Sequence, residues 1–361
     1  YTKEDTLSLH DALPISPRLA VKVSQATGGS KDATPSKSVF EFMDMKVQAE
    51  KKNNDIKGSG NLEIKKGVVM AAAFEKMQAQ FDYQNDVLGI HGFQAHAFQG
   101  DISMEGKVKP GKLHWIMKPV ITNINMAEVV DTLTQYKGLF KGIFSGSFTA
   151  NSSADDTQKG AIDATGSFQL DHGEIMNVNL VDTVMESLFG IKGVSMFAEK
   201  EGSELDKQKI TRFDSMDGDF SMTRNTINLK KVALHNIHTV KITETDASID
   251  GLVDCNTNSL NLKGKIVLSQ EYSARLAKKT EQLSALLNPE SRMVLPISIT
   301  GSLSKPVPIL DIPYVTTAMA KYYGKRELEK LGDKIGLPKK GDKDKQDKES
   351  PIGNILKDLM K

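Results

Sequence analysis

Apolar and polar residues alternate with a period of two along most of this chain, and the pattern begins at Val39. Met43, Met45 and Val47 alternate with charged or polar neighbours, as expected for a strand with one buried face. Similar stretches follow at hairpin spacing, at Leu62 and Ile64, 68–74, 93–98, 102–108 and 113–117, and around Phe144, Ile162, Met216, Ile227, Ile237, Ala247, Leu260 and Ile297. Closely spaced strands of this kind predict an antiparallel meander.

Four stretches depart from this alternation and fit helices instead. They are residues 126–136, 178–188, 271–287 and 314–335, and the third ends just before Pro289. Because strands dominate, the sequence predicts a mainly β fold. We expect a large curved antiparallel sheet or groove with a few helices and a helical, charged C-terminal tail.

The end of that tail has its own pattern. Residues 339–349 carry no apolar side chain, and the stretch PIGNILKDLMK then places Ile352, Ile355, Leu356, Leu359 and Met360 at helical spacing. We predict a short amphipathic helix on a charged tether. It folds back onto the end of the protein's own groove or frays, or it docks at a membrane surface or an assembly partner.

A glycine recurs in the frame apolar-x-Gly-x-apolar. The frame occurs around Gly100, Gly106, Gly146, Gly166, Gly218, Gly251, Gly264 and Gly301. Each glycine shares a face with its apolar neighbours, and a glycine inside a strand marks a bulge, a bend or a close approach. The repetition predicts a strongly curved sheet with an apolar concave face. Ordinary sheet twist against a covering helix is the alternative.

The apolar positions around these glycines are the candidate lining of a trough. They are Phe144, Gly146, Phe148, Phe168, Met216, Gly218, Phe220, Ile249, Gly251, Val253, Leu262, Gly264, Ile266, Ile299 and Gly301. We predict that a bulky residue at Gly146, Gly218, Gly251 or Gly264 obstructs the trough while the sheet still folds.

Composition narrows the classes of protein that this chain can belong to. Hydrophobic residues make up 39% and charged residues 26% of the 361 residues, a balance typical of globular proteins. A net charge of +1 and 6% aromatic residues give neither the field nor the stacking surfaces of a nucleic-acid binder. Apolar runs such as residues 68–74 are far shorter than the about 20 residues that span a bilayer.

Ser302 and Lys305 have the Ser-x-x-Lys spacing that some acylating hydrolases use. They stand at a strand end before Pro306, where no helical turn can stack the hydroxyl and the amine. We therefore predict no catalytic residue. The single cysteine, Cys255, excludes an intramolecular disulfide and an all-cysteine zinc site. Neighbouring Asp254 disfavours its thiolate, and we expect Cys255 to be a small buried apolar residue.

The histidines do not form a recognisable metal site in the sequence. His235 and His238 lie three apart in a strand-rich segment, so they are expected on opposite faces. His91 and His96 are likewise expected on opposite faces of an uninterrupted strand. We therefore predict no metal and no cofactor, and place these histidines at the surface or in a cavity.

Four consecutive segments carry a resemblance to a known family. They are ATGSFQLDHGEIMNVNLVD, FDSMDGDFSMTRNTINLKKVALHN, ASIDGLVDCNTNSLNLKGKIVLS and VLPISITGSLSKPVPILDI. Their order and spacing resemble the AsmA-like C-terminal region, over about residues 140–312. The inner-membrane anchor typical of that family is absent from this sequence. We attribute its absence to truncation.

The resemblance implies a function. AsmA-like proteins resemble long β-groove lipid carriers that are anchored in the inner membrane of diderm bacteria, project through the periplasm and are associated with outer-membrane assembly. We therefore expect a non-enzymatic periplasmic protein that conducts phospholipid between the two membranes, with phospholipid, the inner membrane and envelope-assembly proteins as partners. A periplasmic scaffold or regulator of outer-membrane assembly that carries no lipid is the alternative.

The pattern also divides the chain. Thr6 to Ser16 look like the translation of a sequencing adapter, so residues 1–16 are excluded from fold reasoning. Residues 17–38 are expected to be a linker and 39–138 a β-rich region that continues the groove. Residues 139–312 form the AsmA-like region and 313–361 the helical and charged tail.

Overall fold

The fold is seen in a computed structural model, which describes residues 39–52, 55–69, 71–110, 114–152, 162–192, 194, 209–239, 242 and 244–334. Three predicted segments lie outside the described residues. They are residues 1–16, the linker expected at 17–38, and the charged tether with its amphipathic helix at 339–361.

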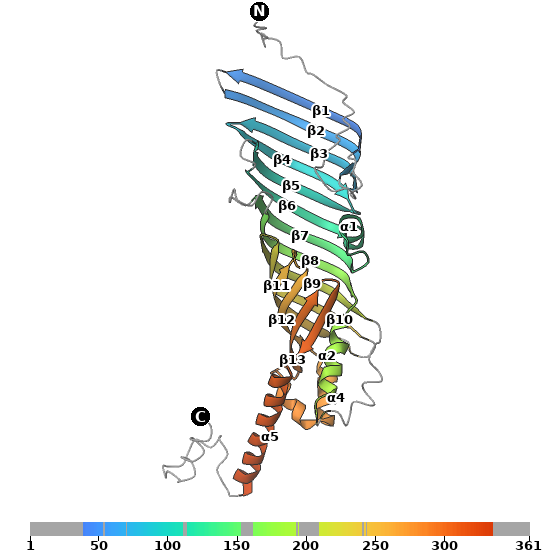
Figure 1. Ribbon diagram of the computed structural model, residues 1–361, viewed down its shortest axis with the longest axis vertical. Coiled ribbons are helices and arrows are strands. Elements are labelled where there is room, and N and C mark those ends of the chain that lie inside the picture. Colours follow the sequence, from blue (N-terminus) through green and yellow to red (C-terminus); the bar gives the residue numbers. More distant parts are fainter. Residues whose placement is uncertain are drawn as a thin grey trace, which may run out of the picture.

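Most of the described residues belong to an antiparallel sheet of 14 strands (Figure 1). Each strand pairs with its neighbours in the sequence, so the order in the sheet is the order in the chain, with β1 and β14 at the two edges. The strands are β1 Val39–Lys52, β2 Asp55–Val69, β3 Ala72–Gln84, β4 Val87–Ala97, β5 Gly100–Lys109, β6 His114–Asn125, β7 Phe140–Ser152, β8 Ile162–Met176, β9 Ile210–Thr223, β10 Thr226–His238, β11 Thr245–Asp254, β12 Ser259–Val267, β13 Val294–Ser302 and β14 Lys305–Leu310. This confirms the predicted mainly β fold and its meander.

The predicted helices form, with one subdivision. They are α1 Met126–Leu133, α2 Leu180–Phe189, α4 Gln270–Lys279 and α5 Ile312–Lys334. Asn125, Asn179 and Ser269 cap the first three through side-chain oxygens that accept backbone N–H groups. The single helix expected over 271–287 ends at Thr280, and the 3-10 helix η3 Glu281–Leu286 follows it.

The C-terminal half of the sheet curls around a continuous hydrophobic core. Leu170 of β8, Val232 of β10, Ile249 of β11 and Ile297 of β13 all belong to this core. Helices α2, α4, η3 and the first turns of α5 add to the same core, and they lie at one end of the molecule (Figure 1). The sheet is therefore closed at this end. Strands β1 to β7 extend away from it as an open layer.

Single-residue bulges bend the strands of this sheet. The bulged residues have positive φ and are Lys76, Gly92, Asn123, His172, Lys231 and Asn236. At each one the strand advances three residues while a neighbouring strand advances two. A bulge of this kind bends the strand and increases its local twist.

Side chains of neighbouring strands accept the backbone N–H groups at three of the bulges. Asn123 donates to Ser145 Oγ at 3.0 Å, Lys231 to Asp250 Oδ1 at 2.6 Å, and Asn236 to Asp246 Oδ1 at 3.2 Å. These bonds satisfy donors that the ladder leaves unpaired. The bends are thus fixed parts of the structure.

The repeating glycines have a different role from the bulges. Of the eight glycines in the frame, only Gly251 and Gly301 have positive φ. The bends that we expected at glycines lie mostly at Lys, Asn and His, because a bulge needs a local change of φ that these residues also accept at a cost.

Candidate functional site

The predicted trough residues lie on one face of the sheet. Cross-strand pairs connect them directly, because Phe168 pairs with Gly146 and Gly218, and Gly251 pairs with Leu262. In the same way Leu262 pairs with Ile299, Gly264 with Ile249 and Gly301 with Pro306. The alternation found in the sequence therefore becomes a continuous apolar face, here called the inner face.

Four phenylalanines form an aromatic row across β7, β8 and β9 on the inner face. The Phe144 and Phe168 rings are stacked with centroids 6.4 Å apart. Phe220 lies 6.5 Å from Phe168 and meets Phe148 edge to face at 5.9 Å. Rings at these distances attract one another beyond simple burial. The row is therefore an ordered apolar surface.

Glycines make room for this row. Gly166 pairs with Phe148 on one side and Phe220 on the other, while Gly146 and Gly218 both pair with Phe168. Each of these three glycines thus has a phenylalanine directly opposite it. In this arrangement the ring covers the bare backbone of the glycine.

The backbone contacts at these glycines argue against their predicted tolerance of bulky residues. A Cβ atom at Gly218 would lie 2.9 Å from Val232 Cα, and one at Gly251 would lie 2.9 Å from Leu262 Cα. At Gly264 it would collide with the Ser248 carbonyl, and at Gly146 it would lie 2.9 Å from the Ser167 carbonyl oxygen. These neighbours are backbone atoms, which cannot rotate away.

Burial divides the inner face into two zones. Ile249, Leu262, Ile266 and Ile299 are less than a tenth exposed and form part of the closed core. The aromatic row is only partly buried. Those four predicted lining residues therefore fill the C-terminal end with side chains, and the row begins the uncovered zone.

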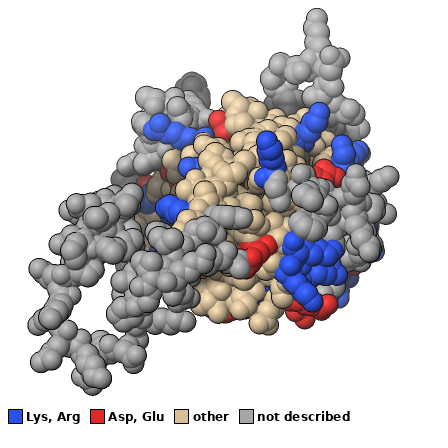
Figure 2. All heavy atoms as spheres, turned by 90° about the horizontal axis from the view of Figure 1, so that it is seen from below, with Lys and Arg blue, Asp and Glu red and all other residues tan. Residues whose placement is uncertain are grey.

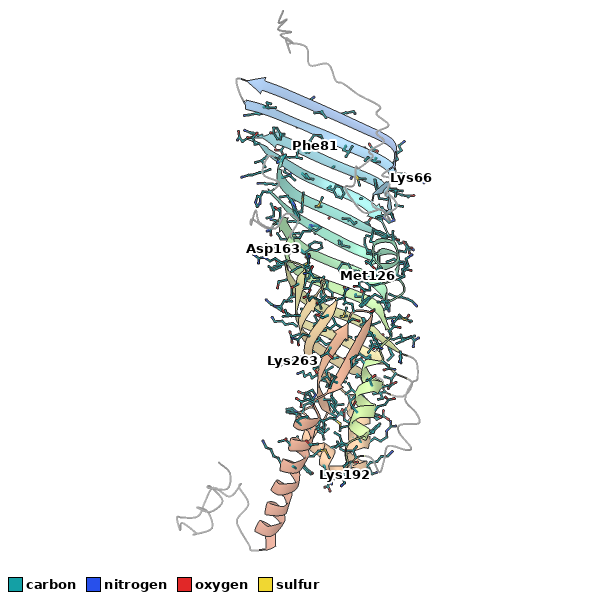
Figure 3. The ribbon with its side chains drawn as sticks, viewed as in Figure 1. Lys66, Phe81, Met126, Asp163, Lys192 and Lys263 are labelled. Atoms are coloured by element: carbon teal, nitrogen blue, oxygen red, sulfur yellow. The ribbon has the colours of Figure 1, made fainter. Side chains whose placement is uncertain are left out.

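The uncovered zone continues toward the N-terminal strands through residues absent from the predicted lining. They include Phe81 of β3 (Figure 3), Phe93 of β4, Met104 of β5 and Met117 of β6, all partly buried. Phe93 pairs with Met104, and Met117 pairs with Gly106. The same alternation in residues 72–117 could have identified them.

The opposite face of the sheet, here called the polar face, carries histidine–aspartate pairs between neighbouring strands. His235 lies 3.0 Å from Asp217 and His238 lies 2.7 Å from Asp214, all between side-chain atoms. The bulge at Asn236 places both histidines on this face, so their predicted separation is wrong. Hydrogen bonds from His238 and Asn236 lower the pKa of Asp214 below its usual value.

A bulge also brings the second pair of histidines onto one face. The bulge at Gly92 places His91 and His96 together on the polar face, where they contact Asp82 and Asp101 respectively. We had expected them on opposite faces. Among the described residues no group of three or more His, Cys, Asp or Glu side chains is placed to hold a metal ion.

The two remaining candidates for chemistry, Ser302 and Cys255, lie at turns. Ser302 Oγ accepts the backbone N–H of Lys305 at 3.2 Å and so caps the β13–β14 turn. Cys255 is exposed in the turn after β11, which contradicts the buried position expected for it. Partial burial and the nearby Asp254 carboxylate raise the pKa of the Cys255 thiol, so its thiolate is disfavoured as predicted.

Figure 2 looks onto the helical end, where the described surface is mostly uncharged and carries both basic and acidic side chains. Among the described residues, no helix combines the length and apolarity needed to cross a bilayer.

Comparison of the chain with protein-family models, curated proteins and solved structures found no match.

Proposed function

We propose that this chain is an AsmA-like envelope protein of a diderm bacterium, located in the periplasm and anchored in the inner membrane. Its sheet shields phospholipid acyl chains as they pass between the two membranes, without catalysis. The observation that supports this function is the partly exposed apolar zone on the inner face. The Phe148, Phe168 and Phe220 rings are only partly buried, in contrast to the completely buried side chains of the C-terminal end.

The physical basis is the transfer of hydrocarbon out of water. Each methylene buried against the inner face contributes about 0.8 kcal/mol. The aromatic row and the neighbouring methionines offer apolar contact along successive strands, while the head group stays in water at the open side. A carrier of this kind needs a continuous apolar surface and no reactive side chain.

The closed C-terminal end favours a second candidate, a scaffold that binds assembly factors and carries no lipid. Ile266, Leu268 and Leu295 are completely buried there, so this part of the sheet has no room for an acyl chain. The two candidates differ in whether the uncovered zone holds lipid.

Native mass spectrometry of protein purified without detergent separates the two candidates. The carrier predicts stoichiometric co-purified phospholipid, released on organic extraction. Phe168→Asp places a charge in the aromatic row and should reduce bound lipid, whereas Gln169→Asp on the polar face is the matched control. A mass without bound lipid for the unmodified chain would favour the scaffold.

A further inference from the structure

The polar face contains a hollow of ≈640 Å³ over strands β6 to β10. Its polar lining residues belong to the polar face, although Phe148 and Phe220 of the aromatic row also border it. Its volume falls within the range of small-ligand sites. The inference drawn from it does not depend on the proposed function.

Hydroxyl groups occupy the middle of this hollow. They come from three adjacent strands and are Ser147, Thr149, Thr165, Ser167 and Ser221. Ser147 pairs with Ser167, Thr149 with Thr165, and Thr165 with Ser221. Neighbouring strands are about 4.8 Å apart, so the hydroxyls form a compact grid. None of them makes a side-chain hydrogen bond to another described residue.

Charged side chains stand at the two ends of the grid. Lys118 of β6 is at one end, while Asp219 of β9 and Lys230 of β10 are cross-strand partners at the other. No described acidic group forms an ion pair with either lysine. Glu105 is the β5 partner of Lys118 in the register, but the two make no ion pair. Both ammonium groups are thus available to a ligand.

A neighbouring hollow on the same face shows the contrast. It has a volume of ≈630 Å³ and shares Val120 with the first. Its polar side chains bond to each other, since Gln78 donates to Gln94 at 2.6 Å and His96 contacts Asp101 at 2.9 Å. Those four side chains therefore have partners, whereas the five hydroxyls of the grid have none among the described residues.

We propose that the hydroxyl grid binds an anionic polyol, a ligand that carries several hydroxyl groups and one phosphate group. The Lys118 ammonium pairs with the phosphate, because a charge-assisted hydrogen bond is stronger than a neutral one. Hydroxyls of Ser147, Ser167 and Thr165 exchange hydrogen bonds with the polyol. At the far end of the grid, the Asp219 carboxylate accepts hydrogen bonds from ligand hydroxyl groups. Its negative charge beside Lys230 disfavours a second anion there.

Isothermal titration calorimetry of the full chain tests this site with glycerol 3-phosphate, inorganic phosphate and glycerol as probes. Glycerol 3-phosphate should bind saturably and more tightly than either of the others. Lys118→Gln should weaken its binding about tenfold. Lys107→Gln removes an exposed lysine of β5 that does not line the hollow, so it should leave the affinity unchanged.

A second variant tests the hydroxyls without a change of charge. The double substitution Ser147→Ala and Ser167→Ala should weaken glycerol 3-phosphate binding and leave the melting temperature unchanged, since both side chains are exposed. Equal affinity for inorganic phosphate would overturn the assignment of a polyol. The site itself would be overturned by the absence of saturable binding, or by an equal loss of affinity in Lys107→Gln.

Discussion

Gly166 lies directly opposite Phe148 in the β7–β8 ladder, and a Cβ atom built on Gly166 would lie 2.6 Å from Phe148 Cα. The glycine thus permits the two strands and the aromatic ring to approach closely. Gly166→Val should destabilise the fold by about 1–3 kcal/mol through overpacking. Thermal and urea unfolding measure this change.

The control for that substitution is the next residue. Ser167 points to the polar face and is exposed, so Ser167→Ala should change the stability by less than about 0.5 kcal/mol. A Gly166→Val protein as stable as the unmodified chain would show that close approach is not the reason for this glycine.

Asp250 supports the bulge at Lys231 through its 2.6 Å hydrogen bond with the backbone N–H. Asp250→Ala removes this acceptor and should cost about 0.5–1.5 kcal/mol. Asp250→Asn keeps an oxygen acceptor and should recover most of the loss. Urea unfolding of the three proteins checks this order, and equal stability of the Ala and Asn variants would contradict it.

The bulges mark the limit of what alternation could predict. A period of two located most of the strands, but residues 68–74, predicted as one strand, span the end of β2 and the start of β3. The pattern also assumes that every strand is regular. In β10 the apolar residues Leu229 and Val232 are three apart on the same face because Lys231 is an extra residue with positive φ. Lysine has no preference for that conformation, so its identity gave no signal. The irregular spacing of the apolar residues was the available clue.

The histidine and cysteine predictions failed for related reasons. His235 and His238 share a face only because Asn236 is bulged. Cys255 was assigned to the alternating face of β11, but the strand ends at Asp254 and the chain turns. By contrast, the aromatic row follows from regular alternation in β7 to β9, where no bulge separates Phe144 from Phe148 or Phe168 from Leu170.

Glu174 joins β7, β8 and β9 through two ion pairs, to Lys141 Nζ at 2.8 Å and to Arg212 Nε at 3.0 Å. Hydrogen bonds from Lys141 and then Arg212 lower the pKa of Glu174 below 4.5. A lowered carboxyl pKa stabilises the fold at a pH above the unfolded-state pKa, and this contribution is lost as the pH falls through the folded-state value.

Glu174→Gln should therefore cost about 1 kcal/mol at pH 7. The difference from the unmodified chain should shrink as the pH is lowered below 4.5. Urea unfolding at a series of pH values measures this convergence. A difference that stays constant down to acid pH would assign the loss to packing instead of charge.

Helix α2 closes the C-terminal end of the sheet with completely buried side chains, among them Leu188. Leu188→Ala should cost about 2–5 kcal/mol, whereas Glu186→Ala on the exposed side of the same helix should cost little. Because Leu188 of helix α2 lies outside the uncovered zone, the amount of lipid bound per folded molecule should stay unchanged in Leu188→Ala. Lipid extraction from the folded fraction checks this.

We predict that phospholipid contacts the inner face and not the polar face. Photoreactive p-benzoylphenylalanine in place of Phe168, or in place of its neighbour Gln169, tests it directly, because the two positions point to opposite faces of β8. After irradiation of the protein in cells, we expect phospholipid adducts at position 168 and none at position 169. Equal labelling at both positions, or no adduct at position 168 in folded protein, would contradict it.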